Sequence, residues 1–209
     1  MSFESVRAAY GSRVSDYVDV VGRIDQVDQA DLELIEDWAR GIDGPILDVG
    51  CGPGQWTDHL AGLGLDVAEF VEHARRTYTD GRYRVGRAED LHVEDGALGG
   101  VLAWYSLIHV EPDHIGAPLA ELARCIRPGG GLALGFFTDS VVAPFDHAVD
   151  IAYYWPIDVL VSRVEDAGFT VTHTGSRADR PERTHAEILA SRRRERPRGA
   201  VAGNGAVVA

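Results

Sequence analysis

Short, continuously apolar runs alternate along the chain with longer segments whose apolar residues recur at helical spacing. Such runs are typical of buried parallel strands, because helices cover both faces of a parallel sheet. The pattern predicts strands at 46–49, 65–68, 82–86, 101–105 and 132–137, and helices at 25–40, 55–63, 70–78, 115–126 and 157–167. Two further strands, at 169–173 and 185–190, follow one another without a helix between them, which predicts an antiparallel hairpin.

This order of elements predicts an α/β fold. Strands that alternate with helices give right-handed crossovers and a doubly wound, mostly parallel sheet with helices on both faces, and the terminal hairpin lies at its edge. The 209 residues are enough for one such domain. We place the domain at 1–191, with a helical cap region at 1–41. We expect 192–209 to be a disordered tail, because it is rich in arginine and small residues and lacks any apolar period.

A glycine turn, Gly50-Cys51-Gly52-Pro53-Gly54, follows the first predicted strand and leads into a helix. Glycines have no Cβ, so a ligand can approach the backbone closely. A strand, a glycine turn and a helix N-terminus together form a cradle for a nucleoside or an anionic group. The spacing is G-x-G-x-G rather than the G-x-G-x-x-G of dinucleotide sites, and Asp48 lies two positions before the first glycine.

This segment resembles motif I of the class I S-adenosylmethionine-dependent methyltransferases, hydrophobic-L-D-x-G-C-G-x-G. The resemblance extends over about residues 10 to 190. The segment 87–91 resembles the stretch after strand three that meets the adenine, and 123–131 resembles the A-R-V-L-R-P-G-G segment before strand five. The resemblance implies a Rossmann-like fold, S-adenosyl-L-methionine as cofactor, and methyl transfer. We expect a small-molecule acceptor.

The resemblance also implies a set of cofactor contacts. Ligands bind at the carboxyl ends of strands in open α/β sheets, and the N-terminal segment of many relatives closes over the cofactor. The implied contacts are Asp48, Gly50, Cys51, Gly52, Gly54, Arg87, Ala88, Glu89, Tyr105 and Tyr17. Arg87 departs from the Asp or Asn that often accepts from the adenine amino group, so Glu89 or Asp90 is expected to do this instead.

The second strand departs from the family pattern. The predicted strand at 65–68 runs directly into the next helix, so about six residues of the usual connection are missing. The acid that holds the ribose hydroxyls has no clear counterpart, and Glu69 is the best substitute because it shares strand parity with Val67. Alternatively, Glu69 is an acid at a helix N-terminus, where the dipole favours it.

Two rival functions follow from these features. The first is a protein of the same fold that has lost cofactor binding through the short connection and serves as a binding or structural protein. The second is a nucleotide-dependent oxidoreductase, which the glycine spacing disfavours.

His109 follows the fourth predicted strand and is a candidate general base, although a lone histidine is more often structural. The aromatic residues Tyr153, Tyr154 and Trp155 are candidates for an acceptor pocket. Methyl transfer requires no metal, and we expect no metal site, because neither the histidines nor the two cysteines show ligand spacing.

Charge and hydropathy narrow the expected partners and location. The net charge of −13 disfavours binding to nucleic acid. No apolar run approaches the ~20 residues that span a bilayer, and the N-terminus lacks the apolar core of a signal peptide. We therefore expect a cytoplasmic protein that binds a small molecule, without membrane or nucleic-acid partners and with no oligomeric state assigned.

Overall fold

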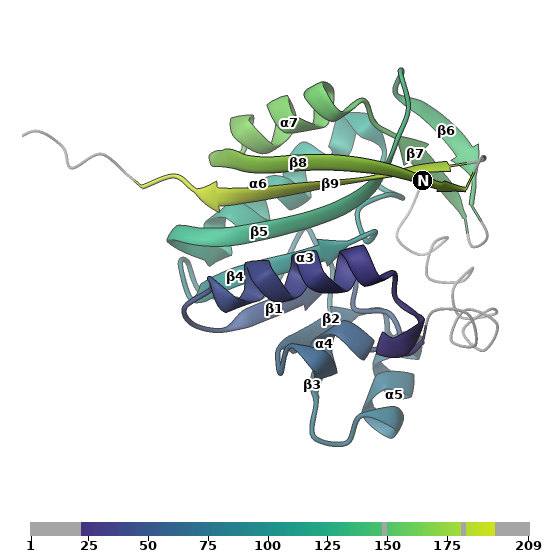
Figure 1. Ribbon diagram of the computed structural model, residues 1–209. Helices are drawn as coiled ribbons and strands as arrows, with labels where there is room; N and C mark the ends of the chain where they lie inside the picture. The colour runs from purple at the N-terminus through teal and green to yellow at the C-terminus, as the bar shows by residue number, and fades with distance from the viewer. Residues whose placement is uncertain (1–21, 148–149, 181–182, 195–209) are drawn as a thin grey trace, which may run out of the picture.

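The computed structural model describes residues 22–147, 150–180 and 183–194 (Figure 1). Its helices are α3 (Gln29–Arg40), α4 (Gln55–His59), α5 (Ala68–Thr77), α6 (Gly116–Cys125) and α7 (Ile157–Asp166), with 3-10 turns at Ile24–Gln26 and Pro112–His114. Its strands are β1 (Ile46–Val49), β2 (Leu63–Asp66), β3 (Arg82–Val85), β4 (Leu98–Trp104), β5 (Ile126–Thr138), β6 (Ala143–Asp146), β7 (Ile151–Tyr154), β8 (Phe169–Arg180) and β9 (Arg183–Arg192). Tyr17 lies outside the described residues.

The strands form one mixed sheet around a parallel centre. Strands β3, β2, β1, β4 and β5 are adjacent and parallel in that order. Strand β9 runs antiparallel to β5 and pairs with it from Gly131 to Thr138, and β8 pairs with β9. The predicted doubly wound sheet with a C-terminal antiparallel hairpin is confirmed.

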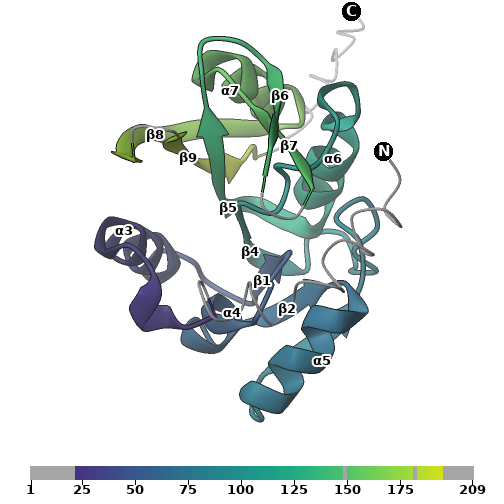
Figure 2. The same ribbon diagram turned by 90° about the vertical axis from the view of Figure 1, so that its right-hand side faces the viewer.

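Helices cover both faces of this sheet, as predicted. In Figure 2, α3, α4 and α5 lie on one side and α6 and α7 on the other. Ile35 of α3 and Trp56 of α4 pack on Leu102 and Ala133. Neighbouring residues of the same strands face the opposite way, because side chains alternate along a strand. Val101 and Leu132 thus belong to the larger core, together with α6 and α7.

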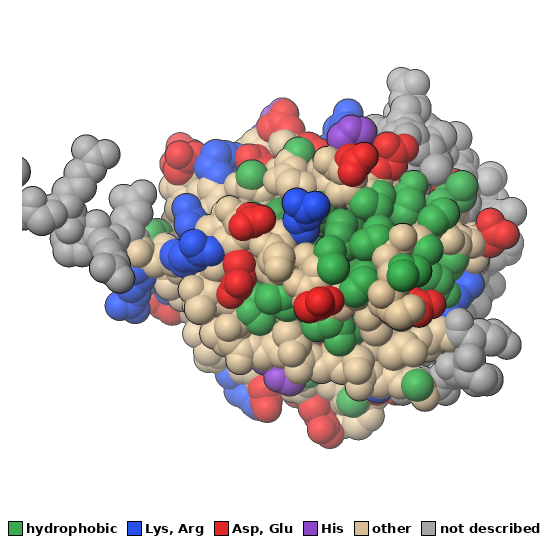
Figure 3. Space-filling model, turned by 90° about the horizontal axis from the view of Figure 1, so that it is seen from above, with side chains coloured by type: hydrophobic (Ala, Val, Ile, Leu, Met, Phe, Trp, Pro, Cys, Tyr) green, Lys and Arg blue, Asp and Glu red, His purple; other side chains and the backbone are tan. Residues whose placement is uncertain are grey.

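The sequence did not predict the hairpin β6–β7. At Phe137, β5 already pairs with β9 along one edge, and β4 ends opposite Gly135 on the other edge. Strand β7 pairs with β5 at Phe137 and therefore occupies the edge that β4 has left. The hairpin thus extends the sheet beyond the carboxyl end of β4. Viewed from above, hydrophobic side chains gather at the end of the molecule that carries this hairpin (Figure 3).

Several predicted boundaries differ from those of the structure, and three of these differences affect the glycine turn, β2 and the tail. Helix α4 ends at His59 rather than at residue 63, and Ala61 then adopts a left-handed backbone with φ of 49°. This early end releases Leu63 to begin β2, two residues before the predicted strand. The tail predicted from residue 192 includes Arg192 and Arg193, which the fold holds: their side chains donate to the carbonyls of Ala123, Gly168 and Phe169.

No helix in the described ranges has both the length and the apolar character needed to cross a bilayer.

Leu132 offers a test of the central core, because its side chain is fully buried on β5. We expect Leu132→Ala to lower the free energy of unfolding by about 2–5 kcal/mol, through lost burial and the cavity left behind. Urea denaturation followed by circular dichroism measures this change. The matched control is Val142→Ala at a 38% exposed position, and an equal loss in both variants would contradict this account of the core.

Candidate functional site

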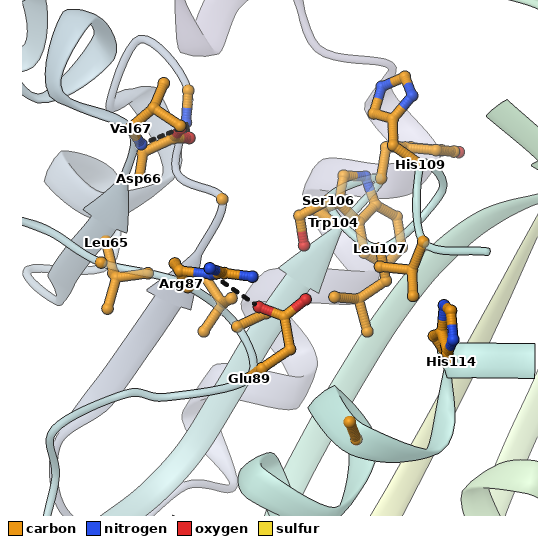
Figure 4. A pocket seen from close by; sticks show the side chains of 18 of the residues that line it. Leu65, Asp66, Val67, Arg87, Glu89, Trp104, Ser106, Leu107, His109 and His114 are labelled. Carbon is orange, nitrogen blue, oxygen red and sulfur yellow. Dashed lines mark hydrogen bonds and ion pairs between the residues drawn. The ribbon is translucent and has the colours of Figure 1, made fainter. Parts of the chain in front are cut away.

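A cavity of about 560 Å³ lies at the carboxyl ends of β1, β2 and β4 (Figure 4). Carboxyl ends of parallel strands meet at one edge of a sheet, so the loops that follow them converge there. The described lining residues include Val49, Gly50, Gly52, Leu65, Asp66, Val67, Phe70, Gly86, Arg87, Ala88, Glu89, Trp104, Tyr105, Ser106, Leu107, His109, Val110, Glu111, Asp113, His114, Gly116 and Ala117. The lining combines apolar side chains with a smaller number of polar groups, as is usual in small-molecule sites.

The glycine turn forms one wall of the cavity. The Gly50 and Cys51 amides both donate to the Leu65 carbonyl, at 2.7 and 3.1 Å, which ties the turn to β2. Gly50 has a φ of 70°, and a Cβ there would lie 2.2 Å from the Ser106 Cβ. Only glycine therefore lets the turn pass beside the residue that follows β4.

Ser106 faces the same cavity. Its Oγ is buried, and it has no hydrogen-bond partner among the groups that the structure describes. Buried polar atoms are nearly always satisfied in folded proteins. A hydroxyl left in this state beside a cavity fits a ligand with a complementary polar group.

Asp66 ends β2 and lines the cavity, at a strand end where the sequence analysis expected no acid. Its Oδ2 accepts from the Gly52 amide at 2.7 Å, and its Oδ1 accepts from the Val67 amide at 2.6 Å. Burial raises the pKa of this carboxyl to about 6, although the two amides oppose the shift. Glu69 lies in the first turn of α5 and is not among the residues lining the cavity. The prediction of a strand without a terminal acid is wrong because β2 ends at Asp66.

Three of the expected cofactor contacts, Asp48, Cys51 and Gly54, are not among the residues that line the cavity. Asp48 is buried and accepts from the Thr57 hydroxyl at 2.7 Å, and burial raises its pKa to about 7. Burial also raises the pKa of the Cys51 thiol, so this cysteine stays protonated. Gly54 has a φ of 99°, and a Cβ there would lie 2.9 Å from that of Ala74. These three residues support the conformation of the turn without lining the cavity.

The expected contacts after β3 and β4 do line the cavity. Arg87, Ala88 and Glu89 form the wall opposite the turn, with the Arg87 Nε 3.5 Å from the Glu89 Oε2. Tyr105 adopts a left-handed backbone with φ of 55°, and its hydroxyl lies 2.7 Å from the His185 Nδ1 of β9. The cross-sheet hydrogen bond helps to hold this unusual conformation.

His109, the candidate general base, also lines the cavity. Its Nδ1 lies 2.8 Å from the Ile151 carbonyl oxygen, and burial lowers the pKa of the ring. The candidates for an acceptor pocket, Tyr153, Tyr154 and Trp155, are not among the described residues that line this cavity. Trp155 is instead a core residue, 3% exposed.

In the described ranges, no group of three or more His, Cys, Asp or Glu could hold a metal ion.

Both the sequence and the fold of the chain are similar to those of known proteins. Residues 46–130 match the family model described as a methyltransferase domain. The fold is similar to that of 1,6-didemethyltoxoflavin-N1-methyltransferase from Burkholderia thailandensis, with a TM-score of 0.72 at 20% identity over 91% of this chain and 88% of that one. It is also similar to a SAM-dependent methyltransferase from Methanosarcina mazei, with a TM-score of 0.65 at 19% identity over 77% and 97% of the two chains.

Residues 46–130 of the chain are thus similar to a methyltransferase domain. Among curated relatives, the chain is 32% identical to demethylmenaquinone methyltransferase of Beutenbergia cavernae over 107 residues, which cover 48% of this chain and 44% of that protein. It is 37% identical to a ubiquinone biosynthesis O-methyltransferase of Xanthomonas oryzae pv. oryzae over 100 residues, 43% and 41% of the two chains. The chain thus spans less than half the length of these relatives.

Burial of Asp48 makes the stability of the protein depend on pH. Burial raises the pKa of this carboxyl from its ordinary value of 3.8 to about 7 in the folded state. The stability that the neutral carboxyl contributes is therefore fully present below about pH 4 and is lost as the pH rises through about 7. Asp48→Asn keeps an acceptor for the Thr57 hydroxyl and removes the titration. We expect it to raise the free energy of unfolding at pH 8 by a few kcal/mol, since one pKa unit corresponds to about 1.4 kcal/mol.

Urea denaturation at pH 5 and pH 8 tests this expectation. The matched control is Asp80→Asn, which removes the same charge from an exposed position. A gain for Asp48→Asn that is equal at both pH values would show that burial of the charge is not its cause.

Proposed function

We propose that this protein binds S-adenosylmethionine in the cavity and transfers its methyl group to a small-molecule acceptor. One observation carries the proposal: the glycine turn and the Asp66 carboxylate meet at one wall of the cavity, joined by the hydrogen bond from the Gly52 amide. The turn lets an adenosyl ligand approach the backbone, and the carboxylate is an acceptor suited to ribose hydroxyls.

The residues present fit this cofactor. Each Asp66 oxygen has a second lone pair beyond the one that an amide uses, so the carboxylate can also accept from two hydroxyls. The Ser106 hydroxyl offers a donor that the described protein groups leave unused. Ala88 and Glu89 lie at the place that the resemblance assigns to the adenine. A volume of about 560 Å³ is typical of a site for a cofactor and a small acceptor.

Charge favours this cofactor over a dinucleotide. The described lining carries four carboxyl groups, those of Asp66, Glu89, Glu111 and Asp113, against the single guanidinium of Arg87. A cavity lined by acids attracts cations and repels a pyrophosphate. The sulfonium of S-adenosylmethionine is a cation, so the rival assignment as a nucleotide-dependent oxidoreductase is disfavoured.

When bound, the cofactor supplies an electrophilic methyl group on a positively charged sulfur. The protein's own contribution is to hold the acceptor in line with the breaking bond and to exclude water. Orientation of this kind can lower a barrier by up to ~7–11 kcal/mol. Trp104, Tyr105 and Leu107 supply apolar surface for it on the β4 side of the cavity.

A small-molecule acceptor is supported by the relatives, which are named for demethylmenaquinone, ubiquinone biosynthesis and malonyl-acyl carrier protein. The alternative of a binding protein that has lost its cofactor rested on a missing acid, and Asp66 removes that ground. We propose that the domain expected at 1–191 extends to Arg193, because the side chains of Arg192 and Arg193 are held by hydrogen bonds to the fold. A cytoplasmic location and the lack of nucleic-acid partners remain predictions.

Calorimetric titration with S-adenosylhomocysteine tests the cofactor assignment. We expect a Kd tighter than about 100 µM, or roughly −5.5 kcal/mol, and no heat of binding with NADH. Binding of NADH without S-adenosylhomocysteine would overturn the proposal in favour of the oxidoreductase, and binding of neither would favour the non-enzymatic alternative.

Two acids three positions apart in the sequence, Asp66 and Glu69, allow a matched test of the ribose contact. Asp66→Asn should weaken S-adenosylhomocysteine binding by about tenfold or more, because hydrogen bonds to a charged group contribute about 1.5–3 kcal/mol. Glu69→Gln removes the same charge from a residue that does not line the cavity, and should change the Kd less than about twofold. The reverse order of effects would restore Glu69 as the ribose acid.

A further inference from the structure

Strand β7 is tied to the loop that carries His109. The Tyr153 amide donates to the Ile108 carbonyl at 2.9 Å, and the His109 Nδ1 lies 2.8 Å from the Ile151 carbonyl oxygen. Both contacts join β7 to the loop after β4, where the hairpin extends the sheet beyond the end of β4. The hairpin is thereby placed to fix the orientation of a side chain that lines the cavity (Figure 4).

A second histidine, His147, packs against His109 from the β6–β7 hairpin. His147 directly follows β6, and its ring lies edge-on to the His109 ring at 5.3 Å between centroids. Phe137 and Phe145 pack around His147 at 6.1 and 6.2 Å, and the Arg183 guanidinium lies over the Phe145 ring. His147 thus fills the space between the His109 ring and the aromatic residues of β5 and β6.

The contact with Ile151 decides which ring nitrogen of His109 carries the proton. A carbonyl oxygen only accepts hydrogen bonds, so the Nδ1 must donate and a neutral ring has its lone pair on Nε2. Burial lowers the pKa of His109, whereas the Ile151 carbonyl and Asp150 raise it. On the hairpin side, burial lowers the pKa of His147 to about 4, so His147 is uncharged at neutral pH. Glu111, Asp113 and His114 line the cavity beside His109.

We propose that the β6–β7 hairpin holds His109 as a neutral imidazole with its proton on Nδ1, that Nε2 is the base for the methyl acceptor, and that His147 is the positioning residue for this ring. The proposal rests on the proposed function and specifies how the site handles a proton. It applies to an acceptor whose hydroxyl or amine loses its proton on methylation.

The bonds in this step balance. A lone pair of the acceptor oxygen or nitrogen forms the new bond to the methyl carbon, and the carbon–sulfur bond breaks. Its electron pair stays on sulfur, which becomes a neutral thioether. The acceptor's proton passes to the His109 Nε2, and the resulting imidazolium keeps its Nδ1 bond to the Ile151 carbonyl. It later releases the proton to water.

Nitrogen-15 NMR of histidine-labelled protein tests the proposal without knowledge of the acceptor. Spectra are recorded with and without S-adenosylhomocysteine, and the His109 signals are assigned by their loss in His109→Gln. We expect the Nδ1-protonated tautomer alone, with a titration midpoint below 6.5. An Nε2-protonated ring, or an average of the two tautomers, would overturn the proposal.

Two substitutions at His147 separate positioning from simple folding. His147→Phe keeps a ring against His109, and we expect the tautomer to be retained. His147→Ala opens that space to water, and we expect mixed tautomers and a higher midpoint. A His147→Ala spectrum that matches the unmodified protein would refute the positioning role. The Kd of S-adenosylhomocysteine should stay within about twofold in both variants, which separates failure of this proposal from failure of cofactor binding.

Discussion

The hydrogen bond between the Gly52 amide and the Asp66 carboxylate is the contact on which the site depends. It joins the turn after β1 to the end of β2, and the Gly50 and Cys51 amides reinforce the junction by donating to Leu65. Because β1, β2 and β4 are parallel neighbours, their carboxyl ends open at the same edge. The cavity is the space that these ends leave, so its shape follows from the register of the sheet.

The interior of this junction is unusually acidic. Asp48 and Asp66 lie on adjacent strands, and each pKa is raised chiefly by burial. Carboxyl groups in such surroundings reduce stability when charged. Asp48 does not line the cavity. Its carboxyl accepts a hydrogen bond from the Thr57 hydroxyl of α4, and this bond fixes the helix that follows the glycines. Asp66 faces the cavity, where a ligand can share its charge. The two acids thus serve different parts of one binding site.

The opposite end of the cavity depends on the β6–β7 hairpin. Strand β4 stops at Trp104, two ladder positions before β5 reaches Phe137. The vacant edge of β5 is taken by β7, whose backbone reaches the loop around His109. The difference in length between β4 and β5 therefore determines which side chains surround His109. The Tyr105–His185 hydrogen bond adds a second tie from the terminal hairpin to the same wall.

The sequence by itself determined the fold class, the resemblance to the methyltransferases and the central glycine turn, because each is encoded by local patterns. Apolar runs mark the parallel strands, and the 50–54 turn requires glycine wherever the backbone has positive φ. Only the tertiary structure decided the rest. Asp66 became the strand-end acid because α4 ends early at His59, which no residue pattern indicated. Strand β5 extends beyond the end of β4, and the β6–β7 hairpin pairs with the edge that this leaves. The neighbours of His109 follow from this pairing between distant segments.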